Sequence, residues 1–562
     1  MTLFLRPDAQ PLGDVDTLTA IRDAAGIATG GRPAVNWWPA DTVEPADQPG
    51  LGDWLAAMAA RHPARRAIDG DGGGLDYAGL DARVNRTARL LRAAGLGVGD
   101  RVAVLSENRT EYLELAFAAA RSGVILAALN WRLSAGELAH CVGLVAPSLL
   151  IASQRFAAAA AGLLPDDRVR VFGRDYETAL THQSPEPLDS DDPAQGLDPE
   201  AGLLILYTSG TTGLPKGALI SHRAELARLA LSTGELGLQS GDGFVAWAPM
   251  FHMVSIEHAM HVLCTGGCVT VVDGADIPRL VDLAGTRPQW WLVLIPGMIE
   301  RVVAEIRDRR ARPGGWRPAP IRMVGALADL LPPDLVADVS GALNAPYWNS
   351  FGSTETGMLP AAGTRFAPGE RPADLAKAPN GLHLWRLVGP DDHDVAPGAA
   401  GEIAVRGPTV FSGYWNAPEA NARDFRGGWF HMGDLFRQRP DGRLDFVDRA
   451  KYMIKSGAEN IYPVEIERVL MTHPRVGEAV VVRRPDRQWG EVPVAFVALA
   501  DGAAAVTPDD LFAHCRAHLA RYKCPREIRF VASRDDFPRS TSGKVQRKLL
   551  EARAMESMEG VA

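Results

Sequence analysis

Short apolar runs alternate with longer amphipathic stretches along the chain from residue 51 onward. The hydrophobic pattern predicts a strand at 101–106, a helix at 109–122 and a second strand at 123–130. Strands and helices that alternate in this way are typical of α/β layers. We therefore predict an α/β fold whose large N-terminal domain, residues 51–449, consists of layered β-sheets and helices.

A second unit follows a segment of turn residues and charges at 441–450. Its own strands are predicted at 479–483, 492–499 and 527–531. We expect a small α+β C-terminal domain over residues 450–562. Residues 1–50, rich in Pro, Gly and Asp, are predicted to form a loosely built extension.

The most apolar run, residues 113–129, is interrupted by Glu114 and Arg121 and is shorter than the roughly 20 residues that cross a bilayer. It predicts a buried helix, a turn and a strand. The first ten residues lack the basic and apolar regions of a secretory signal. We expect a cytoplasmic protein without an integral membrane segment.

Charge and cysteine content narrow the class of protein further. The 59 Lys and Arg against 68 Asp and Glu give a net charge of −9, which does not favour nucleic acid as a partner. The five scattered cysteines indicate free thiols and no structural metal. Residues 521–548 carry nine basic side chains against three acids, which suits a polyphosphate ligand or a solvated face equally.

The strongest chemical motif is LLILYTSGTTGLPKG at residues 203–217, an apolar strand that leads into hydroxyls, glycines and a lysine. Glycines let backbone N–H groups approach anionic oxygens, hydroxyls add donors and the lysine adds charge. A P-loop NTPase needs Gly before the lysine and Ser or Thr after it, where this chain has Pro215 and Gly217. We predict a phosphate-binding loop of another type, with the candidates Thr208, Ser209, Gly210, Thr211, Thr212, Gly213 and Lys216.

The loop and the motifs that follow it, between about residues 200 and 550, resemble the signature of the acyl-adenylate-forming superfamily in their order. The later motifs are WNSFGSTETG at 348–357, GWFHMGD at 428–434, FVDR at 446–449, IKSGAENIYP at 454–463 and FPRSTSGK at 537–544. The resemblance implies that the loop at 208–216 holds the β- and γ-phosphates of ATP. It also implies a mobile C-terminal domain.

The same resemblance assigns roles within the motif at 348–357, which includes Gly352 among the nucleotide-binding residues. Phe351 would stack on adenine, Asn349 would bond its amine, Thr354 would bond the α-phosphate and Glu355 would hold Mg²⁺. The family usually has Tyr where this chain has Phe351, so stacking is kept while a ring hydroxyl is lost.

The downstream motifs imply further roles. Asp434 would grip both ribose hydroxyls, Arg449 would contact ribose or phosphate, and Lys451 would be the hinge of the C-terminal domain. The loop at Gly457 would enter the site for thioester formation, and Lys544 would be the catalytic lysine of the first step. Ala458 and Tyr452 depart from the family's usual Gly and Asp.

The resemblance implies an acyl-CoA synthetase that joins a small carboxylic acid to AMP with Mg-ATP and then to coenzyme A. Alternatives are an enzyme that stops at acyl-AMP or loads an acyl carrier protein, an oxygenase of the luciferase type, and a non-catalytic binding protein. The intact loop, Glu355 and Lys544 argue against the last.

The class of carboxylic acid substrate is indicated by the residue at position 252. Amino-acid-activating members carry an Asp where this chain has His252, and a buried ammonium without its carboxylate is costly. His252 would act as a gate or in the thioester step, or pack as a core histidine. Neighbouring apolar residues favour an apolar acid, including bulky or cyclic ones, over acetate; they are Met250, Met253, Val254, Met298 and Leu327.

Overall fold

The computed structural model describes most of the chain from Gly50 to Glu556. The described residues are 50–70, 73–189, 192–194, 196–209, 214–295, 297–326, 328, 331–456, 459–539 and 544–556. The predicted N-terminal extension lies outside them except for Gly50. The chain divides into two compact units, which we call the first unit (Met1–Ala275, Ser353–Gly357 and Arg406–Phe430) and the second unit (Asp276–Gly352, Met358–Val405 and His431–Ala562).

The first unit contains a seven-stranded sheet in the order β17-β8-β7-β4-β3-β5-β6. The strands from β7 to β6 run parallel, while β8 pairs antiparallel with β7 and with β17. Parallel strands are usually covered on both faces and are therefore mostly apolar. The strands are β3 (Arg101–Leu105), β4 (Ile125–Ala128), β5 (Leu149–Ala152), β6 (Val169–Val171), β7 (Gly202–Ser209), β8 (Pro215–Ser221) and β17 (Gly413–Tyr414).

The predicted strand, helix and strand between residues 101 and 130 are confirmed as β3, α4 (Thr110–Ser122) and β4. Helix α4 is buried on nearly all sides, and the buried residues include the charged Glu114. It ends at Gly123, whose φ of 66° is the left-handed conformation that glycine adopts without strain. The apolar run at 113–129 is thus a helix, a turn and a strand in the interior.

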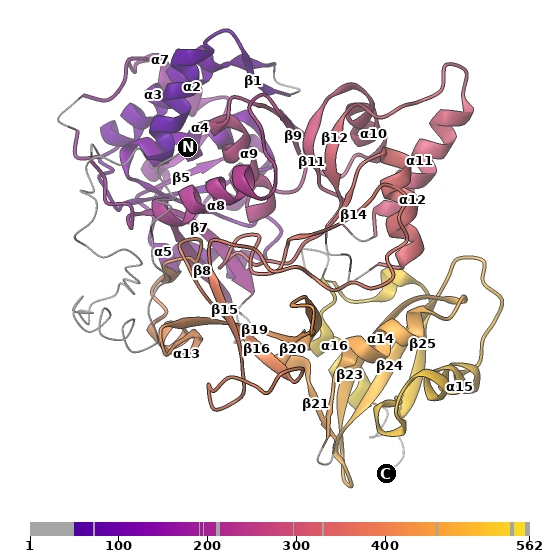
Figure 1. Ribbon diagram of the computed structural model, residues 1–562. Coiled ribbons are helices and arrows are strands. Elements are labelled where there is room, and N and C mark those ends of the chain that lie inside the picture. Colours follow the sequence, from indigo (N-terminus) through magenta and orange to yellow (C-terminus); the bar gives the residue numbers. More distant parts are fainter. Residues whose placement is uncertain are drawn as a thin grey trace. The chain divides into compact units, whose positions relative to one another are not determined.

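A second group of strands in the first unit consists of β9 and β1 on either side of β10, all parallel, with β2 antiparallel to β1. Helices pack around both groups (Figure 1). The strands are β1 (Arg66–Asp69), β2 (Leu75–Asp76), β9 (Gly243–Ala246) and β10 (Cys268–Val271). The helices are α2 (Leu51–Arg61), α3 (Tyr77–Ala93), α5 (Ala135–Val145), α6 (Ala157–Ala160), α7 (Asp175–Thr181), α8 (His222–Gly234), α9 (Met253–Cys264) and α13 (Pro418–Asp424).

The second unit begins with alternating helices and parallel strands, closed by the antiparallel strand β14. Buried tryptophans on β11 and β13 form its core, where the rings of Trp291 and Trp348 meet edge to face at 4.8 Å. Helices α11 and α12 lie side by side (Figure 1). The elements are α10 (Ile277–Thr286), β11 (Gln289–Leu292), α11 (Ile299–Ala311), β12 (Ile321–Val324), α12 (Pro333–Leu343), β13 (Tyr347–Asn349) and β14 (Thr364–Phe366).

A mostly antiparallel sheet follows, in which β19 pairs with β18 and with β20. Its register places Asp434 on β19 opposite Arg449 on β20. The strands are β15 (Leu384–Val388), β16 (Ala400–Arg406), β18 (Phe425–Arg426), β19 (Trp429–Gln438) and β20 (Leu444–Arg449).

The predicted C-terminal strands are present in a five-stranded sheet of the second unit. Alternate residues of β23 and β24 face two apolar clusters: Val481 and Val497 pack in one, while Val480 and Phe496 pack in the other. This is the period of two expected for strands buried on both faces. The elements are β21 (Ile454–Ser456), β22 (Glu459–Ile461), α14 (Pro463–Met471), β23 (Val476–Asp486), β24 (Gly490–Leu499), α15 (Pro508–His518), β25 (Glu527–Val531) and α16 (Arg547–Glu556).

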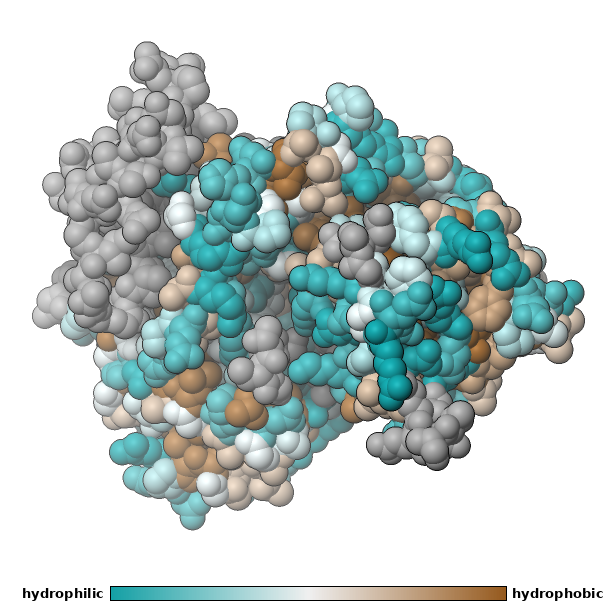
Figure 2. All heavy atoms as spheres, turned by 90° about the horizontal axis from the view of Figure 1, so that it is seen from below, coloured by the Kyte–Doolittle hydropathy of each residue, from teal (hydrophilic) through white to brown (hydrophobic). Residues whose placement is uncertain are grey.

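The surface carries both hydrophilic and apolar side chains (Figure 2). Figure 2 shows one face of the molecule, on which hydrophilic side chains lie between separate apolar patches. Scattered apolar side chains of this kind are ordinary on a protein surface. Among the described helices, none has the length and apolar character needed to span a bilayer. All five cysteines are free thiols, as predicted.

Candidate nucleotide site

The predicted phosphate loop connects β7 and β8. These strands pair antiparallel with Thr208 opposite Lys216 and Ser209 opposite Pro215. Residues 210–213, which include four of the predicted phosphate ligands, lie outside the described residues. Lys216 is therefore held by a strand at the end of the hairpin, with its side chain 17% exposed.

Lys216 belongs to a cluster with Glu355, Tyr414 and Asp424, which we call the Lys216 cluster. The ammonium nitrogen lies 3.6 Å from the centroid of the Tyr414 ring and 3.5 Å from Oδ2 of Asp424. The Tyr414 hydroxyl donates a hydrogen bond of 2.9 Å to Oε1 of Glu355. Lys216 and Glu355, two predicted site residues about 140 positions apart in the sequence, thus both contact Tyr414.

Burial lowers the pKa of Lys216, and the nearby carboxylates of Asp424 and Glu355 counteract this. Burial also raises the pKa of Tyr414, with Glu355 adding to the effect, so the hydroxyl stays protonated and remains a donor. Asp424 has a second cationic partner, Arg423, at 2.7 Å. The cluster therefore places one half-buried ammonium near two carboxylates, an arrangement that negatively charged phosphates would alter directly.

The loop that carries Glu355 is fixed by its backbone. Ser353 and Gly357 form an isolated antiparallel bridge, and the Phe411 N–H donates to the Glu355 carbonyl at 2.8 Å. The carbonyl of Thr354 accepts a hydrogen bond of 3.1 Å from Arg228. Glu355 is thereby held by its own main chain as well as by Tyr414.

Glu355 fits the predicted role of a magnesium ligand. Magnesium prefers oxygen ligands and commonly uses one or two carboxylates with phosphate oxygens and water. Within the described ranges, no group of three or more His, Cys, Asp or Glu side chains could hold a metal ion. A single carboxylate beside a bound nucleotide is enough for such a site, because phosphate oxygens and water supply the other ligands.

In the second unit, the predicted ribose ligand Asp434 is paired with the predicted Arg449. Nε of Arg449 lies 2.9 Å from Oδ1 of Asp434, across the β19 and β20 register. Asp434 is 2% exposed, whereas Arg449 is 41% exposed. The arginine thus orients a buried carboxylate while its own side chain reaches the surface.

The predicted adenine residues lie at the end of β13. Phe351 contacts two other phenylalanines, with ring centroids 4.8 Å from Phe436 and 5.9 Å from Phe446. Asn349 is completely buried, donates to the Leu375 carbonyl at 2.9 Å and accepts from the ammonium of Lys377. Its amide orientation is therefore set by the protein, and its contact with adenine stays a prediction. Gly352 follows Phe351 directly.

Three predicted site residues, Lys451, Gly457 and Lys544, come from the C-terminal part of the chain. Lys451 lies in a short 3₁₀ turn, Ala450–Tyr452, with its ammonium 4.9 Å from the Tyr452 ring centroid. Lys544 is exposed, next to a bridge between Arg539 and Val545. Gly457 and Ala458 lie outside the described residues.

The basic stretch at 521–548 is largely neutralised by acids. Five of its nine cations have carboxylate partners within 3.0 Å, from elsewhere in the second unit or within the stretch. These cations are Lys523, Arg529, Arg534, Arg539 and Arg547. More than half of the basic side chains in this stretch are therefore paired with carboxylates.

His252 precedes α9 as its N-cap residue, and its ring lies 4.5 Å from the ring of Phe251. Met250 and Met298 are buried, Met253 and Val254 are half-buried, and Leu327 lies outside the described residues.

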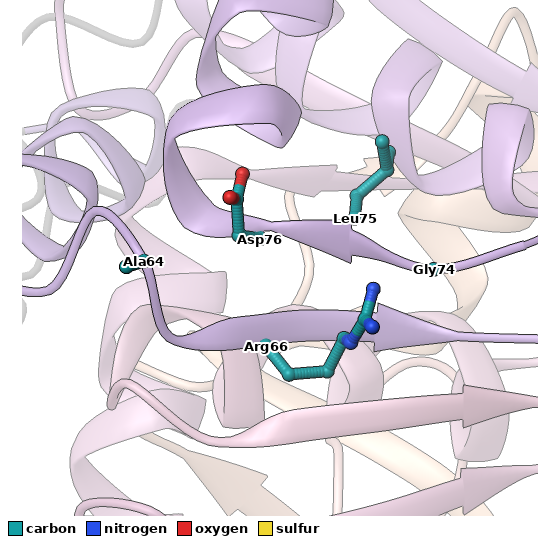
Figure 3. Close-up of a pocket in the computed structure, with 5 residues that line it drawn as sticks. All are labelled: Ala64, Arg66, Gly74, Leu75 and Asp76. Carbon is teal, nitrogen blue, oxygen red and sulfur yellow. The ribbon is translucent and has the colours of Figure 1, made fainter.

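A separate cavity of about 260 Å³ lies between β1 and β2 (Figure 3). It is lined by Ala64, Arg66, Gly74, Leu75 and Asp76, a set that includes no predicted site residue.

Sequence comparison covers most of the chain. The AMP-binding enzyme family matches residues 55–415, and the C-terminal domain of AMP-binding enzymes matches residues 465–544. The chain belongs to the AMP-binding enzyme family. The predicted superfamily, the α/β fold with a smaller C-terminal domain and the class of AMP-forming ligase are thereby confirmed.

Relatives of this AMP-binding enzyme include named CoA ligases. Feruloyl-CoA synthase of an Amycolatopsis species is 35% identical over 501 residues, which is 88% of this chain and 97% of that protein. Indoleacetate–CoA ligase of Aromatoleum aromaticum is 35% identical over 509 residues, covering 88% and 96%. The ATP-bound structure of MatB from Rhodopseudomonas palustris superposes with a TM-score of 0.76 at 27% identity, covering 90% of this chain and 99% of that one.

Four side chains around these sites were not predicted from the sequence of this AMP-binding enzyme. Tyr414 and Asp424 complete the Lys216 cluster, Lys377 holds Asn349, and Arg228 holds Thr354. Each comes from a segment remote from the motif that it supports. A Gly-Tyr-Trp sequence at 413–415 is a weak signal for Tyr414, because its position beside Lys216 depends on the pairing of β17 with β8.

Proposed function

We propose that this enzyme activates an apolar carboxylic acid, including bulky or cyclic acids, with Mg-ATP to form an acyl-AMP and then transfers the acyl group to coenzyme A. The observation that carries the proposal is the Lys216 cluster. In it, Tyr414 contacts both Lys216, which follows the glycine-rich loop, and the carboxylate of Glu355. That arrangement offers a cation for phosphate oxygens and a carboxylate for their metal ion.

In the first step a carboxylate oxygen of the acid attacks the α-phosphorus of ATP. A new P–O bond forms, the bond between the α- and β-phosphates breaks, and pyrophosphate leaves with the electron pair. The residues of this chain contribute position and charge and form no covalent bond with the substrate. Lys216 stabilises the charge that develops on the leaving phosphates, which would replace Asp424 as its partner.

Glu355 holds the magnesium ion, which neutralises phosphate charge when it is bound. The other nucleotide contacts follow the resemblance. Thr354 bonds the α-phosphate, Asp434 the ribose hydroxyls, and Phe351 and Asn349 the adenine. Lys544 bridges the acid and the α-phosphate, where a point charge draws two anions together.

In the second step the thiol of coenzyme A attacks the acyl carbon of the mixed anhydride. The C–S bond forms, the C–O bond breaks and AMP leaves. We propose that the C-terminal domain, residues 450–562, turns about Lys451 between the two steps and that the loop at Gly457 serves the second. A carrier-protein thiol is the alternative acceptor, and an enzyme that stops at acyl-AMP is the other.

Two observations support an apolar acid. The position of the ammonium-binding Asp in amino-acid-activating relatives is occupied by His252, beside the Phe251 ring. The named relatives activate a feruloyl and an indoleacetate group, both of which contain an aromatic ring. Burying a charged amino acid without a carboxylate partner would be costly, so an apolar acid suits this site better.

The proposal is tested with the purified chain, ATP, magnesium and a panel of aliphatic, aromatic and amino acids. Pyrophosphate release without coenzyme A reports the first step, and the thioester mass with coenzyme A reports the second. We expect aromatic or other bulky apolar acids to exceed acetate and amino acids in both readouts. Preference for amino acids would contradict the substrate class, and acyl-AMP without any thioester would favour the carrier-protein or adenylate-only alternative.

A further inference from the structure

Arg228 on α8 is a buried arginine that joins two segments of the first unit. Its side chain is 2% exposed. Nη2 donates to the carbonyl of Thr354 at 3.1 Å and Nε donates to the carbonyl of Thr409 at 3.0 Å. The planar guanidinium suits this task, because its donors have fixed directions and reach several acceptors at once.

The charge of Arg228 is balanced by Glu257 on α9, whose Oε1 lies 2.5 Å from Nη1 and whose side chain is 2% exposed. Burial raises the pKa of Glu257, and Arg228 counteracts this. A buried ion pair is retained at a considerable desolvation cost. The hydrogen bonds from Arg228 to the two carbonyls offer a functional reason for keeping this ion pair.

Both carbonyls belong to segments that carry the Lys216 cluster. Thr354 directly precedes Glu355, and Thr409 lies five residues before Tyr414. Between these two points the segments are bonded to each other, because the Phe411 N–H donates to the Glu355 carbonyl. Arg228 thus links the two segments at one end, and the hydrogen bond between Tyr414 and Glu355 links them at the other.

A second arginine of α8 holds the same segment from another position. Arg223 donates to the carbonyls of Pro408 and Val410 and is paired with Glu200 at 2.6 Å. Three consecutive carbonyls, 408 to 410, are therefore bonded to arginines of one helix. Arg228 differs from Arg223 in that it also reaches the segment of Glu355.

We infer that Arg228, held by Glu257, is a positioning residue that sets the Glu355 carboxylate for magnesium bound with ATP. The inference rests on the magnesium role of Glu355 proposed above. Residues that orient a metal ligand typically change metal affinity by about 10- to 100-fold when they are replaced. Loss of Arg228 is therefore expected to weaken the contribution of magnesium to ATP binding and to leave ATP binding without metal nearly unchanged.

The test measures ATP affinity by calorimetry in EDTA and in saturating magnesium, and takes the ratio of the two dissociation constants as the magnesium gain. Arg228→Lys keeps the charge opposite Glu257 but cannot span both carbonyls. We expect its magnesium gain to fall by about 10-fold or more, with the affinity in EDTA changed by less than about 2-fold. Arg83→Lys is the matched control, since Arg83 also pairs with a buried glutamate, Glu114, in the first unit. Its magnesium gain should equal that of the wild type.

Glu355→Gln separates this inference from the proposed metal ligand. If Glu355→Gln keeps the wild-type magnesium gain, the proposed role of Glu355 is wrong and the inference falls with it. If Glu355→Gln loses the gain and a folded Arg228→Lys keeps it, the inference alone is overturned. Equal losses with and without magnesium in Arg228→Lys would also overturn it. If Arg228→Lys does not fold, the double variant Arg228→Gln with Glu257→Gln, which removes both charges of the buried pair, is measured under the same criteria. No acid or coenzyme A enters the test, so failure of the thioester reaction would not affect its result.

Discussion

At the scale of single residues, the side chains that we expect to meet ATP are already bonded to protein groups. Glu355 is oriented by Tyr414, Asp434 by Arg449, and Asn349 by Lys377. Such partners fix a side chain before the ligand arrives, which lowers the entropic cost of binding. The predicted ligands and Arg449 came from motifs in the sequence, whereas Tyr414 and Lys377 lie outside those motifs and were not predicted.

Tyr414→Phe removes the hydroxyl that bonds Glu355 and keeps the ring that faces Lys216. Hydrogen bonds to charged groups contribute about 1.5 to 3 kcal/mol, so magnesium-dependent ATP affinity should fall by about 10-fold or more. Calorimetry with and without magnesium measures the change. Tyr176→Phe, which loses a hydroxyl contact with Thr87 instead, is the matched control and should bind Mg-ATP like the wild type. Equal affinities for wild type and Tyr414→Phe would show that the hydroxyl does not serve the metal.

Asp434→Ala removes the carboxylate that we assign to ribose. Two charge-assisted bonds would be lost, each contributing about 1.5 to 3 kcal/mol, so ATP affinity should fall by at least 10-fold, with or without magnesium. Asp445→Ala, on the neighbouring strand β20 and paired with Arg439, serves as the control and should leave ATP affinity unchanged. Wild-type ATP affinity in a folded Asp434→Ala variant would remove Asp434 from the site.

At the scale of secondary structure, local patterns predicted elements well and pairing poorly. The strand, helix and strand at 101–130 and the strands near 479, 492 and 527 follow from apolar periodicity alone. The contact between Lys216 and Tyr414 depends on β17, two residues long, which pairs with β8 across nearly 200 residues of sequence. Periodicity carries no information about such a partner, since any strand edge offers the same backbone groups.

The end of β20 is joined to the start of α14 by Asp448. This buried carboxylate accepts the N–H groups of Val464, in the first turn of α14, and of Arg449, at 3.0 and 2.6 Å. Burial raises its pKa to about 6, while Arg547 and the Val464 N–H counteract this. The folded state is therefore less stable when this carboxylate must carry its charge in the interior.

The raised pKa of Asp448 predicts a pH dependence with a definite sign. An acid whose pKa rises from about 3.9 unfolded to about 6 folded favours the folded state most below pH 4, and this contribution is lost as the pH rises through 6. The change amounts to about 2 to 3 kcal/mol. Asp448→Asn should remove this component, so urea midpoints measured between pH 4.5 and 7 should fall less with pH in the variant. Identical slopes in both proteins would contradict the assignment.

At the scale of the whole molecule, the order of motifs was sufficient to predict the family and the two-step chemistry. The family assignment covers residues 55–415 and 465–544, which contain the Lys216 cluster except Asp424, and Lys544 as well. What the motifs did not predict was the supporting network. Arg228 lies twelve residues after Lys216 in an ordinary helical sequence, and its function depends on carbonyls more than 100 residues away.

Lys544→Ala tests the division of labour between the two steps. If Lys544 serves adenylation, the variant should form acyl-AMP about 10²-fold more slowly, as when an electrostatic donor to a transition state is removed. It should still convert supplied acyl-adenylate and coenzyme A to thioester at the wild-type rate. Lys548→Ala, another lysine of the same basic stretch, is the control and should slow neither step. Loss of both steps in a folded Lys544→Ala variant would refute the assignment.

The most direct measurement uses a carboxylic acid labelled with ¹⁸O in its carboxylate, from the aromatic members of the panel, with ATP, magnesium and coenzyme A. If the carboxylate attacks the α-phosphorus, its oxygen stays with the phosphate when the thiol displaces AMP. Mass spectrometry should then find one ¹⁸O in each AMP, together with unlabelled pyrophosphate and the acyl thioester. Thioester formed with ADP and labelled inorganic phosphate, or with unlabelled AMP, would contradict the acyl-adenylate route.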